Sequence, residues 1–432
     1  MPETTLEDGS QTPPLSPEFK ARQKRFDDAK SLTRPDRVPV APVVMHYFPN
    51  IRKGISNREV HYDRALKHQL WRSAIVDHDW DAAVNSFSVI QGQPLELLGM
   101  TQLKWPGGGL PPDRPFQYVE GEYMLQDEYD EVLADPNGFT VKKLWPRVAT
   151  ALAPWSAMAQ AGLPPLLPLA NPYALPGFIG GMLANPEVMT MLERIVAVGK
   201  EGYEDRKAVA AYSSDMMLLG YPFPYQTANI VAFDAVSDML RGLRGTFLDM
   251  YQVPDKLLAL VEMHIPWTIE QSIWMARETG NSGVFLALHR GAAGFMSNEQ
   301  FAKFYWPGLK ALLLGLIDAG LTPIPFFEGD YTSRLEFLQE LPAKKVIGHF
   351  DRIDRRKAKE LLGDVMCFWG NVPSSLLCAG TVQQVKDDVR ELIEIFGDDG
   401  GLIVDGTVGI PDEARPANIF AMTEAVHEFG SY

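Results

Sequence analysis

Cysteine is scarce in this chain of 432 residues, which contains only Cys367 and Cys378. Two cysteines cannot build a disulfide framework or a four-cysteine metal site. Both lie in ordinary strand-like and helix-like sequence, where a cysteine usually behaves as a small buried hydrophobic residue. We therefore interpret both as packing residues.

The chain also has fewer basic than acidic residues and no long apolar runs. The chain has 40 Lys and Arg against 55 Asp and Glu, a formal net charge of -15, whereas nucleic-acid binding needs clustered Lys and Arg. No stretch approaches the roughly twenty apolar residues that span a bilayer. Residues 1–17 are rich in Thr, Pro, Glu and Ser, and lack the basic start and apolar core of a signal peptide. These absences predict a cytoplasmic protein without nucleic-acid or membrane partners. The composition of residues 1–17 predicts a disordered N-terminal tail.

Apolar strand-like runs recur through the last third of the chain, and each is followed by polar residues. The runs and their polar neighbours are Val284–Leu288 before His289 and Arg290, Thr322–Phe327 before Glu328, Lys345–Gly348 before His349, Val365–Trp369 before Asn371, and Gly401–Val404 before Asp405. The helical segments between them are Asn298–Ala319, Ser333–Leu341, Arg355–Leu362 and Thr381–Phe396. A series of βα units favours a parallel sheet, and in a closed barrel the carboxyl ends of the strands form one rim. We expect the polar residues to share that rim.

The first half of the chain is less regular. The predicted helices are Glu18–Ser31, Asp63–Asp77, Lys142–Ala161 and Pro186–Ala211, and the predicted strands are Arg37–Met45, Ala82–Ile90 and Leu163–Asn171. Proline and glycine predict loops at Trp105–Pro115 and Tyr221–Asn229. A chain of this length, 46% apolar, can bury a large core. We predict an α/β fold, a single distorted (β/α)8 barrel of the TIM type over residues 18–432, with an N-terminal helical elaboration.

Several short motifs, concentrated in the C-terminal third, resemble those of the uroporphyrinogen decarboxylase superfamily. They are Pro35–Val40, Gly370-Asn371-Val372-Pro373, Gly401-Leu402-Ile403-Val404, Gly409-Ile410-Pro411 and Pro416-x-Asn418. The resemblance extends from about Phe19 to Tyr432. It implies a distorted βα barrel with its site at the carboxyl rim.

Two activities occur in that superfamily, and this chain departs from the decarboxylases. Those enzymes carry an arginine-rich segment after the first strand and an essential aspartate in a later segment. Here the first position reads Met45–Asn50, and the second reads Phe87-Ser88-Val89-Ile90, with valine where the aspartate should fall. A substrate with several carboxylates needs guanidinium partners, so tetrapyrrole decarboxylation is disfavoured.

The other branch resembles corrinoid-dependent methyltransferases, in which zinc activates a thiol or an ether oxygen. The thiolate ligands of that branch are absent, because their positions fall on Phe326-Phe327-Glu328 and Thr407-Val408. Glu328 and His349, with twenty residues between them, are similar to part of a Glu/His zinc signature of ether-cleaving members, although its upstream glutamate falls on Leu313. The resemblance implies Zn²⁺ at Glu328 and His349, and a cobalamin supplied by a separate corrinoid protein.

The residue types support a metal independently of the family. Zinc accepts imidazole nitrogen and carboxylate oxygen, and a catalytic site uses about three protein ligands. Glu328 and His349 follow successive strands, and His289, Asp351 and Asp405 remain open as the third ligand. A metal bound to a substrate oxygen would stabilise the charge that develops as a C–O bond breaks.

Roles for the other candidates follow from their chemistry. We predict Glu328, His349 and Asp405 as catalytic residues. The predicted substrate-binding residues are His46, Tyr47, His289, Arg290 and Asn371. His78, between Asp77 and Asp79, is interpreted as a surface residue, because consecutive residues of a helix cannot all face one ion.

Three functions are open at this point. The first is a zinc-dependent O-demethylase-type methyltransferase that moves a methyl group from a small methyl ether, aromatic or otherwise, or from a related methyl donor, to a separate corrinoid protein. The second is a cobalamin-independent, metal-dependent lyase, hydratase or hydrolase, and the third is a non-catalytic ligand-binding barrel. The substrate, the choice between a corrinoid and a folate acceptor, and a homodimeric state are not determined by the sequence.

Overall fold

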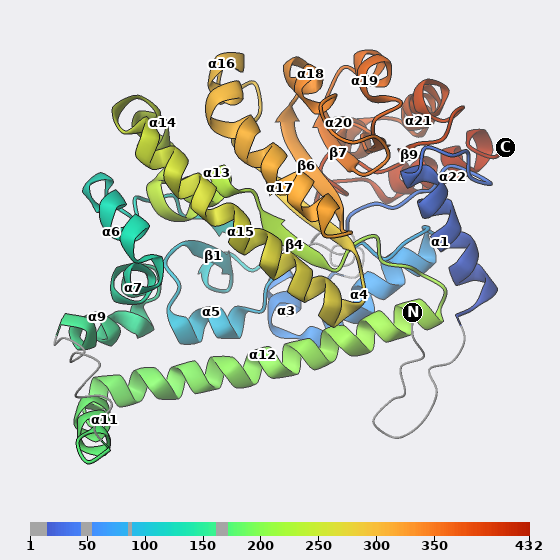
Figure 1. Ribbon diagram of the computed structural model, residues 1–432. Helices are drawn as coiled ribbons and strands as arrows, with labels where there is room; N and C mark the ends of the chain where they lie inside the picture. Colours follow the sequence, from blue (N-terminus) through green and yellow to red (C-terminus); the bar gives the residue numbers. More distant parts are fainter. Residues whose placement is uncertain (1–14, 45–53, 85–88, 161–171) are drawn as a thin grey trace.

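The computed structural model describes residues 15–44, 54–84, 89–160 and 172–432 (Figure 1). Most of the predicted tail, the predicted substrate-binding residues His46 and Tyr47, and the predicted strand Leu163–Asn171 lie outside these ranges. Within them no helix is both long enough and apolar enough to cross a membrane.

The centre of the molecule is a parallel sheet of six strands in sequence order, from β4 to β9. The strands are β4 Thr227–Ile230, β5 Gly283–Leu288, β6 Thr322–Asp330, β7 Ile347–Arg352, β8 Cys367–Trp369 and β9 Leu402–Ile403. The predicted α/β class with a parallel sheet is therefore confirmed. β7 begins later than predicted, and His349 lies inside this strand rather than after it.

Alternate side chains of the strands pack on opposite faces of the sheet, as the two-residue period of a strand requires. On one face the rings of Phe327, Phe350 and Phe368 stack in succession, and Phe368 continues onto Phe396 of a covering helix. On the other face a second apolar cluster gathers Ile324, Ile347, Cys367, Trp369 and Ile403. Cys367 is buried, as interpreted, and Cys378 is half-buried.

Helices follow the strands and cover the first of these faces (Figure 1). They are α15 Pro254–Thr279, α16 Asn298–Gln300, α17 Trp306–Asp318, α18 Leu335–Leu338, α19 Arg355–Leu362, α20 Ser374–Ala379, α21 Val382–Phe396 and α22 Pro416–Phe429. α19 has the predicted bounds, and α21 begins directly after its capping residue Thr381, whose hydroxyl accepts the N–H of Gln384 at 3.2 Å. The predicted helix Asn298–Ala319 is realised as α16, a π-helical turn at Phe301–Tyr305 and α17.

Two extended segments from the first half of the chain bond to the edges of this sheet. The N–H of Ala41 donates to the carbonyl of Val404 (3.0 Å), and the N–H of Val404 donates to the carbonyl of Pro39 (2.9 Å). The N–H of Asp81 donates to the carbonyl of Val40 (2.8 Å). The next residues of that second segment reach the other edge, where the N–H of Ala83 donates to the carbonyl of Pro222 (2.9 Å), upstream of β4. The predicted strands Arg37–Met45 and Ala82–Ile90 thus include these two segments as far as the structure describes them.

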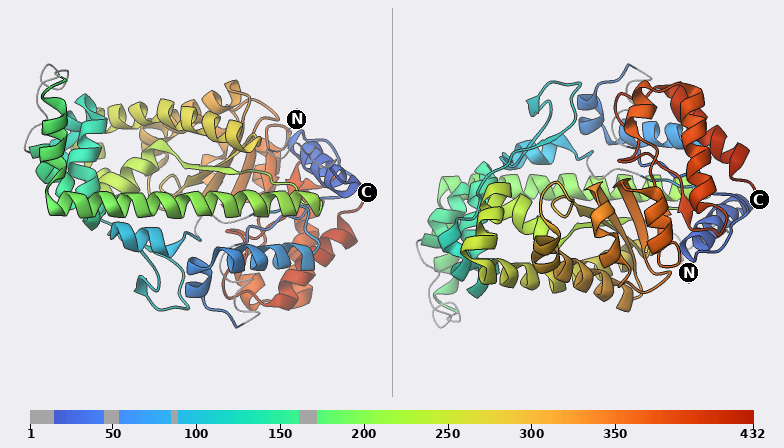
Figure 2. Two further views of the ribbon diagram at one scale, coloured as in Figure 1. Left: turned by 90° about the horizontal axis from the view of Figure 1, so that it is seen from below. Right: turned by 90° about the horizontal axis from the view of Figure 1, so that it is seen from above.

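The remaining helices form an elaboration beside the sheet, except for the last two of them along the chain, which follow β4. They are α1 Pro17–Lys30, α3 Asn57–Tyr62, α4 Arg64–Asp77, α5 Gly92–Leu98, α6 Tyr129–Ala134, α7 Pro136–Phe139, α8 Trp145–Val148, α9 Ala153–Gln160, α11 Leu175–Leu183, α12 Pro186–Leu218, α13 Ala232–Val236 and α14 Gly242–Gln252. A small sheet in the order β2-β1-β3 is formed by β1 Leu103–Pro106, β2 Gly109–Leu110 and β3 Gln117–Tyr118. α12 runs along one whole side of the molecule (Figure 2).

Both loop predictions were right in part, since residues 111–115 and 221–226 contain no helix or strand. Trp105–Pro115 contains β2 and the end of β1, and Tyr221–Asn229 runs into β4. Pro222 and Pro224 suggested a loop, but they precede the paired residues of β4, where a missing backbone N–H disrupts no ladder. The first residues of β4 pair with β5 from Thr227 opposite Val284.

Candidate functional site

Charged side chains gather where β4, β5, β6 and β7 end. The carboxyl ends of parallel strands lie at one edge of a sheet, so residues that are distant in sequence meet there. His289 and Arg290 follow β5, while α13 and a π-helical turn at Ser237–Arg241 follow β4. We define the rim cluster as Asp234, Asp238, His289, Arg290, Glu328 and Asp351.

His289 lies between two carboxylates of the rim cluster. Its Nδ1 is 2.5 Å from Oδ2 of Asp238, and its Nε2 is 3.8 Å from Oε2 of Glu328. Burial lowers the pKa of His289, but the hydrogen bond to Asp238 and the charges of Asp234, Asp238 and Glu328 outweigh it and raise the pKa to about 9. The side chain is 29% exposed and that of Glu328 is 48% exposed. A small molecule can therefore reach a protonated imidazole.

Asp234 fixes the turn that carries His289. Its carboxylate is fully buried and accepts the backbone N–H groups of His289 (2.7 Å) and Arg290 (3.1 Å) and the hydroxyl of Tyr305 (2.7 Å). Burial raises the pKa of Asp234 to about 6, although the charge of His289 opposes the rise. Burial also raises the pKa of Glu328, again against the charge of His289. The histidine and its acidic neighbours therefore determine one another's protonation.

Arg290 is held by protein carboxylates. One terminal nitrogen lies 2.8 Å from Oδ1 of Asp238 and 2.9 Å from Oε1 of Glu120, and its Nε donates to the hydroxyl of Ser237 at 3.2 Å. These contacts couple the β5 end to β3 and to the segment after β4. The predicted role of Arg290 in substrate binding stays a prediction.

The charge on His289 gives a pH-dependent contribution to stability. The folded-state pKa of about 9 lies above the ordinary value of 6.5. The stabilisation is therefore fully present below about pH 6.5 and is lost as the pH rises through about 9. We expect the His289 ring resonances to titrate near pH 9 in an NMR experiment. We also expect urea unfolding to show a wild-type advantage over His289→Gln that shrinks between pH 6.5 and 9.5. A titration midpoint near pH 6.5 would show that Asp238, Asp234 and Glu328 do not raise the pKa of His289.

His349 and Asp405, two of the predicted catalytic residues, form a separate buried pair. Nε2 of His349 lies 3.3 Å from Oδ2 of Asp405, and the two side chains are 2% and 0% exposed. The imidazole packs against the rings of Phe326 (4.7 Å between centroids) and Trp369 (5.1 Å). Asp405 also accepts the N–H groups of Val43 and Gly406, and burial raises its pKa. This pair lies within the second apolar face rather than on the exposed rim.

Asn371 is bonded to protein groups on both sides of its amide. Its Nδ2 donates to the carbonyl of Asp351 at 3.0 Å, and its Oδ1 accepts from Nε of Arg355 at 2.9 Å. Arg355 in turn makes a bidentate pair with Asp388. The asparagine therefore ties the end of β7 to α19, and its predicted contact with substrate is untested.

The predicted zinc pair does not fit the arrangement of the described residues. Glu328 faces His289, whereas His349 faces Asp405 and is enclosed by aromatic rings. Across the four described ranges, no three or more His, Cys, Asp or Glu side chains are placed to hold a metal ion. No step proposed below therefore uses a metal. Zinc binding itself stays a prediction, and elemental mass spectrometry of the wild type, Glu328→Ala and His349→Ala decides it.

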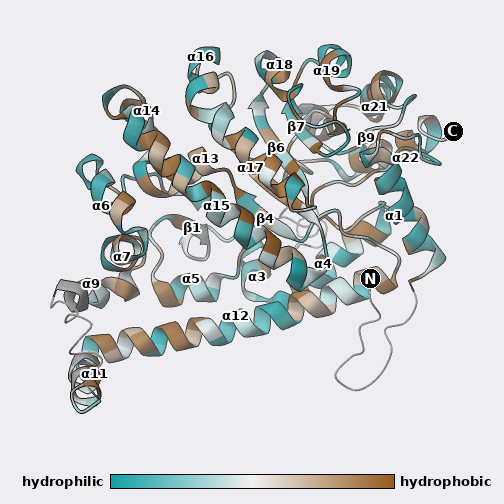
Figure 3. Cartoon of the chain, in the orientation of Figure 1, coloured by the Kyte–Doolittle hydropathy of each residue, from teal (hydrophilic) through white to brown (hydrophobic). Residues whose placement is uncertain are grey.

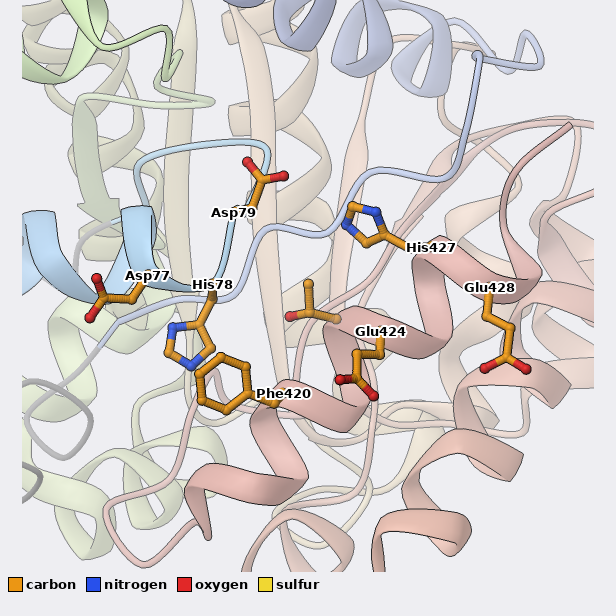
Figure 4. Close-up of a pocket in the computed structure, with 8 residues that line it drawn as sticks. Asp77, His78, Asp79, Phe420, Glu424, His427 and Glu428 are labelled. Carbon is orange, nitrogen blue, oxygen red and sulfur yellow. The ribbon is translucent and has the colours of Figure 1, made fainter.

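His78 is buried, so its interpretation as a surface residue was wrong. It is 3% exposed, its ring stacks on Phe420 of α22 at 4.1 Å, and its Nδ1 lies 2.8 Å from the carbonyl of Ala74. It lines an open cavity of about 500 Å³ between the end of α4 and α22, with Thr423 and acidic residues around it (Figure 4). None of the residues that line this cavity belongs to the rim cluster.

The fold and the rim cluster together define an α/β protein with ionisable side chains at the carboxyl ends of a parallel sheet. Residues 231–429 match the family of uroporphyrinogen decarboxylase (URO-D), so the superfamily resemblance carried by the motifs is confirmed. A uroporphyrinogen decarboxylase of Pseudoalteromonas translucida (strain TAC 125) is 26% identical over 141 residues, which make up 32% of this chain and 39% of that protein. The matched segment thus spans well under half of that relative.

A solved structure extends the likeness to nearly the whole chain. The fold is similar to that of a methyltransferase from Methanosarcina mazei, with a TM-score of 0.59 and 16% sequence identity over 94% of this chain and 98% of that one. At this identity the likeness establishes a shared fold.

Sequence reasoning missed Asp234 and Asp238, which surround His289. The signal was present as two aspartates four residues apart, a spacing that places both on one helical face. This spacing was not recognised as a site signal, because the residues of β4 were predicted to be a loop and the aspartates therefore did not follow a predicted strand. A strand end followed by such a pair would have marked both residues as candidates.

Proposed function

We propose that this protein is an enzyme of the methyltransferase type, with the rim cluster as its active centre and a small methyl ether as its substrate. The observation that carries the proposal is the His289 imidazole, held by Asp238 at 2.5 Å and facing Glu328 at 3.8 Å on an accessible strand end. The fold shared with a methyltransferase and the superfamily match support it.

The chemistry of ether cleavage suits this arrangement. A nucleophilic acceptor attacks the methyl carbon, and a new bond from acceptor to carbon forms as the C–O bond breaks. The electron pair stays on the oxygen, which takes the proton of His289 Nε2 and leaves as an alcohol or phenol. A general acid in this position typically contributes about 10²–10⁴-fold to the rate. Solvent then reprotonates the imidazole.

Each neighbour of His289 has a role in this scheme. Asp238 orients the ring through Nδ1 and stabilises the imidazolium, in the manner of a carboxylate behind a catalytic histidine. Glu328 adds a second negative charge on the substrate side. Asp234 acts through the backbone N–H groups that it holds and is a positioning residue.

We infer that the sheet continues into a closed, distorted (β/α)8 barrel around this centre. The hydrogen bonds that link β9 to segment 37–44, that segment to 81–84, and Ala83 to Pro222 support the closure. Closure would place the ends of eight strand segments around one rim, and His46 and Tyr47 would follow the first of them.

The acceptor of the methyl group is proposed to be a corrinoid on a separate protein, as the superfamily resemblance implies. A corrinoid supplies a strong nucleophile that no side chain of the rim cluster provides. The exposed faces of His289 and Glu328 leave the centre open to such a partner.

The proposal is tested by incubating the protein with aromatic methyl ethers and a reduced corrinoid, and by measuring the phenol and the methylated corrinoid. We expect both products in equal amounts. Glu328→Gln should lower the rate by about 10–100-fold, because an amide supports the imidazolium less than a carboxylate, whereas Glu394→Gln, an exposed change on α21, should have no effect. Phenol without corrinoid would favour a lyase or hydrolase, and no product with any ether would overturn the proposal.

A further inference from the structure

An extended segment beside the rim cluster carries an exposed aromatic side chain. We call it the β3 arm, residues 117–120, which consists of β3 and the two residues after it. β3 pairs antiparallel with β1, and the pairing continues as the N–H of Val119 donates to the carbonyl of Gln102 at 2.9 Å. Successive side chains of an extended segment point to opposite faces. Tyr118 and Glu120, two residues apart, therefore lie on the same face of the arm.

That face is turned toward the rim cluster. Oε1 of Glu120 accepts from a terminal nitrogen of Arg290 at 2.9 Å, and from the backbone N–H of Leu243 in the first turn of α14 at 3.0 Å. Desolvation by the surrounding protein raises the pKa of the Tyr118 hydroxyl above its ordinary value of 10, and the charge of Asp238 adds to the rise. The residue is nevertheless 55% exposed. Tyr118 thus borders the charged groups and stays open to a ligand.

Two more apolar side chains are exposed around the same charged groups. The guanidinium of Arg290 lies over the ring of Phe295, 5.4 Å from its centroid, and Phe295 is 42% exposed. Met239, the residue after Asp238, is 40% exposed, and its carbonyl accepts from Nε2 of Gln102 at 3.1 Å. Figure 3 shows hydrophilic and hydrophobic residues side by side in the nearby helix α14. Small-molecule sites combine apolar walls with a few placed polar groups, and the surroundings of the rim cluster have this composition.

We propose that Tyr118 is a specificity-determining residue of the rim cluster, and that its ring stacks on the aromatic ring of an aryl methyl ether whose oxygen meets Nε2 of His289. This inference rests on the function proposed above and concerns the part of the substrate beyond the C–O bond. An aromatic pair is stabilised beyond the area that it buries, because the two π-systems attract each other in stacked or edge-on geometry. An alkyl methyl ether covers the same surface without this attraction, so Tyr118 favours the aryl ether.

The first test compares the binding of phenol and cyclohexanol, which have the same ring size and one hydroxyl each. Both are titrated by ligand-observed NMR, without a corrinoid and without turnover. We expect the wild type to bind phenol about 3- to 10-fold more tightly than cyclohexanol, the factor that an aromatic pair adds. Tyr118→Leu keeps an apolar side chain and should lose this preference. Tyr118→Phe keeps the ring and should retain it.

Tyr203→Leu is the matched control. Tyr203 is 56% exposed on α12, nearly the same exposed fraction as Tyr118, and it lies outside the rim cluster beside Lys207, whose Nζ is 5.5 Å from the centroid of its ring. The substitution removes an equally exposed tyrosine, so it should leave the preference for phenol unchanged. An equal loss of preference in Tyr203→Leu and Tyr118→Leu would overturn the assignment to Tyr118.

Turnover separates this inference from the proposed function. With a reduced corrinoid, the ratio of kcat/KM for anisole to kcat/KM for cyclohexyl methyl ether should fall by about 3- to 10-fold in Tyr118→Leu, mainly through KM. The ratio is compared between variants, because a phenol is the better leaving group in any enzyme. An unchanged ratio together with unchanged binding preference would overturn the role of Tyr118 and leave the proposed function intact. Binding of phenol that depends on Tyr118, without cleavage of either ether, would support the aromatic wall and overturn the proposed function.

Discussion

Replacing His289 by glutamine is expected to lower the turnover number by about 10²–10⁴-fold, the usual loss when a general acid is removed. Glutamine has a similar length and can hydrogen-bond to Asp238, but it cannot carry the proton that the leaving oxygen needs. The Michaelis constant should change much less, because the proton is transferred in the transition state. Steady-state kinetics of methyl ether cleavage, with circular dichroism to verify folding, measure both quantities.

The pH profile separates a proton donor from a structural histidine. The donor must be protonated, so wild-type activity should persist at low and neutral pH and fall as the pH rises through about 9, the folded-state pKa of His289. Asp238→Asn removes the hydrogen bond that raises this pKa most, and should move the loss of activity toward neutral pH. His427→Gln is the control with unchanged kinetics, because His427 lines the cavity beside His78 and does not belong to the rim cluster. A His289→Gln enzyme with wild-type turnover would eliminate the histidine as the acid.

The strands of the last third were predictable because each is a short apolar run ended by polar residues. β5 and β8 end where the sequence predicted, and β6 begins as predicted but continues through Glu328 to Asp330. The prediction thus placed His289, Arg290 and Glu328 near one edge of the sheet. Which side chains contact one another at this edge depends on the register between neighbouring strands. The local sequence pattern does not determine that register. Phe326 lies opposite His349, so His349 lies two residues further from the carboxyl edge of the sheet than Glu328. Glu328 therefore faces His289, and His349 faces Asp405.

The site was incompletely predicted because one strand was missed. The prolines before β4 suggested a loop, and the following aspartates then appeared to be unrelated to any strand end. Burial is a second property that the local sequence conceals. His78 lies between two aspartates, a polar context typical of a surface, yet α22 covers its ring through Phe420. Both errors have tertiary causes, since pairing and packing partners come from distant parts of the chain.

Asp81→Ala is expected to destabilise the folded state by about 3–5 kcal/mol, the typical cost of removing one partner from a buried ionic network. The carboxylate is fully buried and accepts from Arg25 Nη1 (2.5 Å), from Arg37 Nη1 (2.6 Å) and Nη2 (2.7 Å), and from the N–H of Val40 (2.8 Å). The substitution leaves the Arg37 guanidinium and the Val40 N–H without this acceptor. Arg25 keeps its bond to Asp36. The free energy of unfolding, measured in urea, should fall by this amount with little change in the denaturant slope.

Asp215→Ala provides the matched control, because it also removes a carboxylate bonded to an arginine. The side chains of Asp215 and Arg72 are 50% and 44% exposed, and the Arg72 Nε to Asp215 Oδ2 distance is 2.8 Å. An exposed pair of this kind contributes about 0–1 kcal/mol, since water solvates both ions when the pair is broken. The difference between the two variants isolates the effect of burial. If Asp81→Ala cost no more than Asp215→Ala, the network at the start of segments 37–44 and 81–84 would not anchor them, and the proposed closure of the barrel through those segments would lose its support.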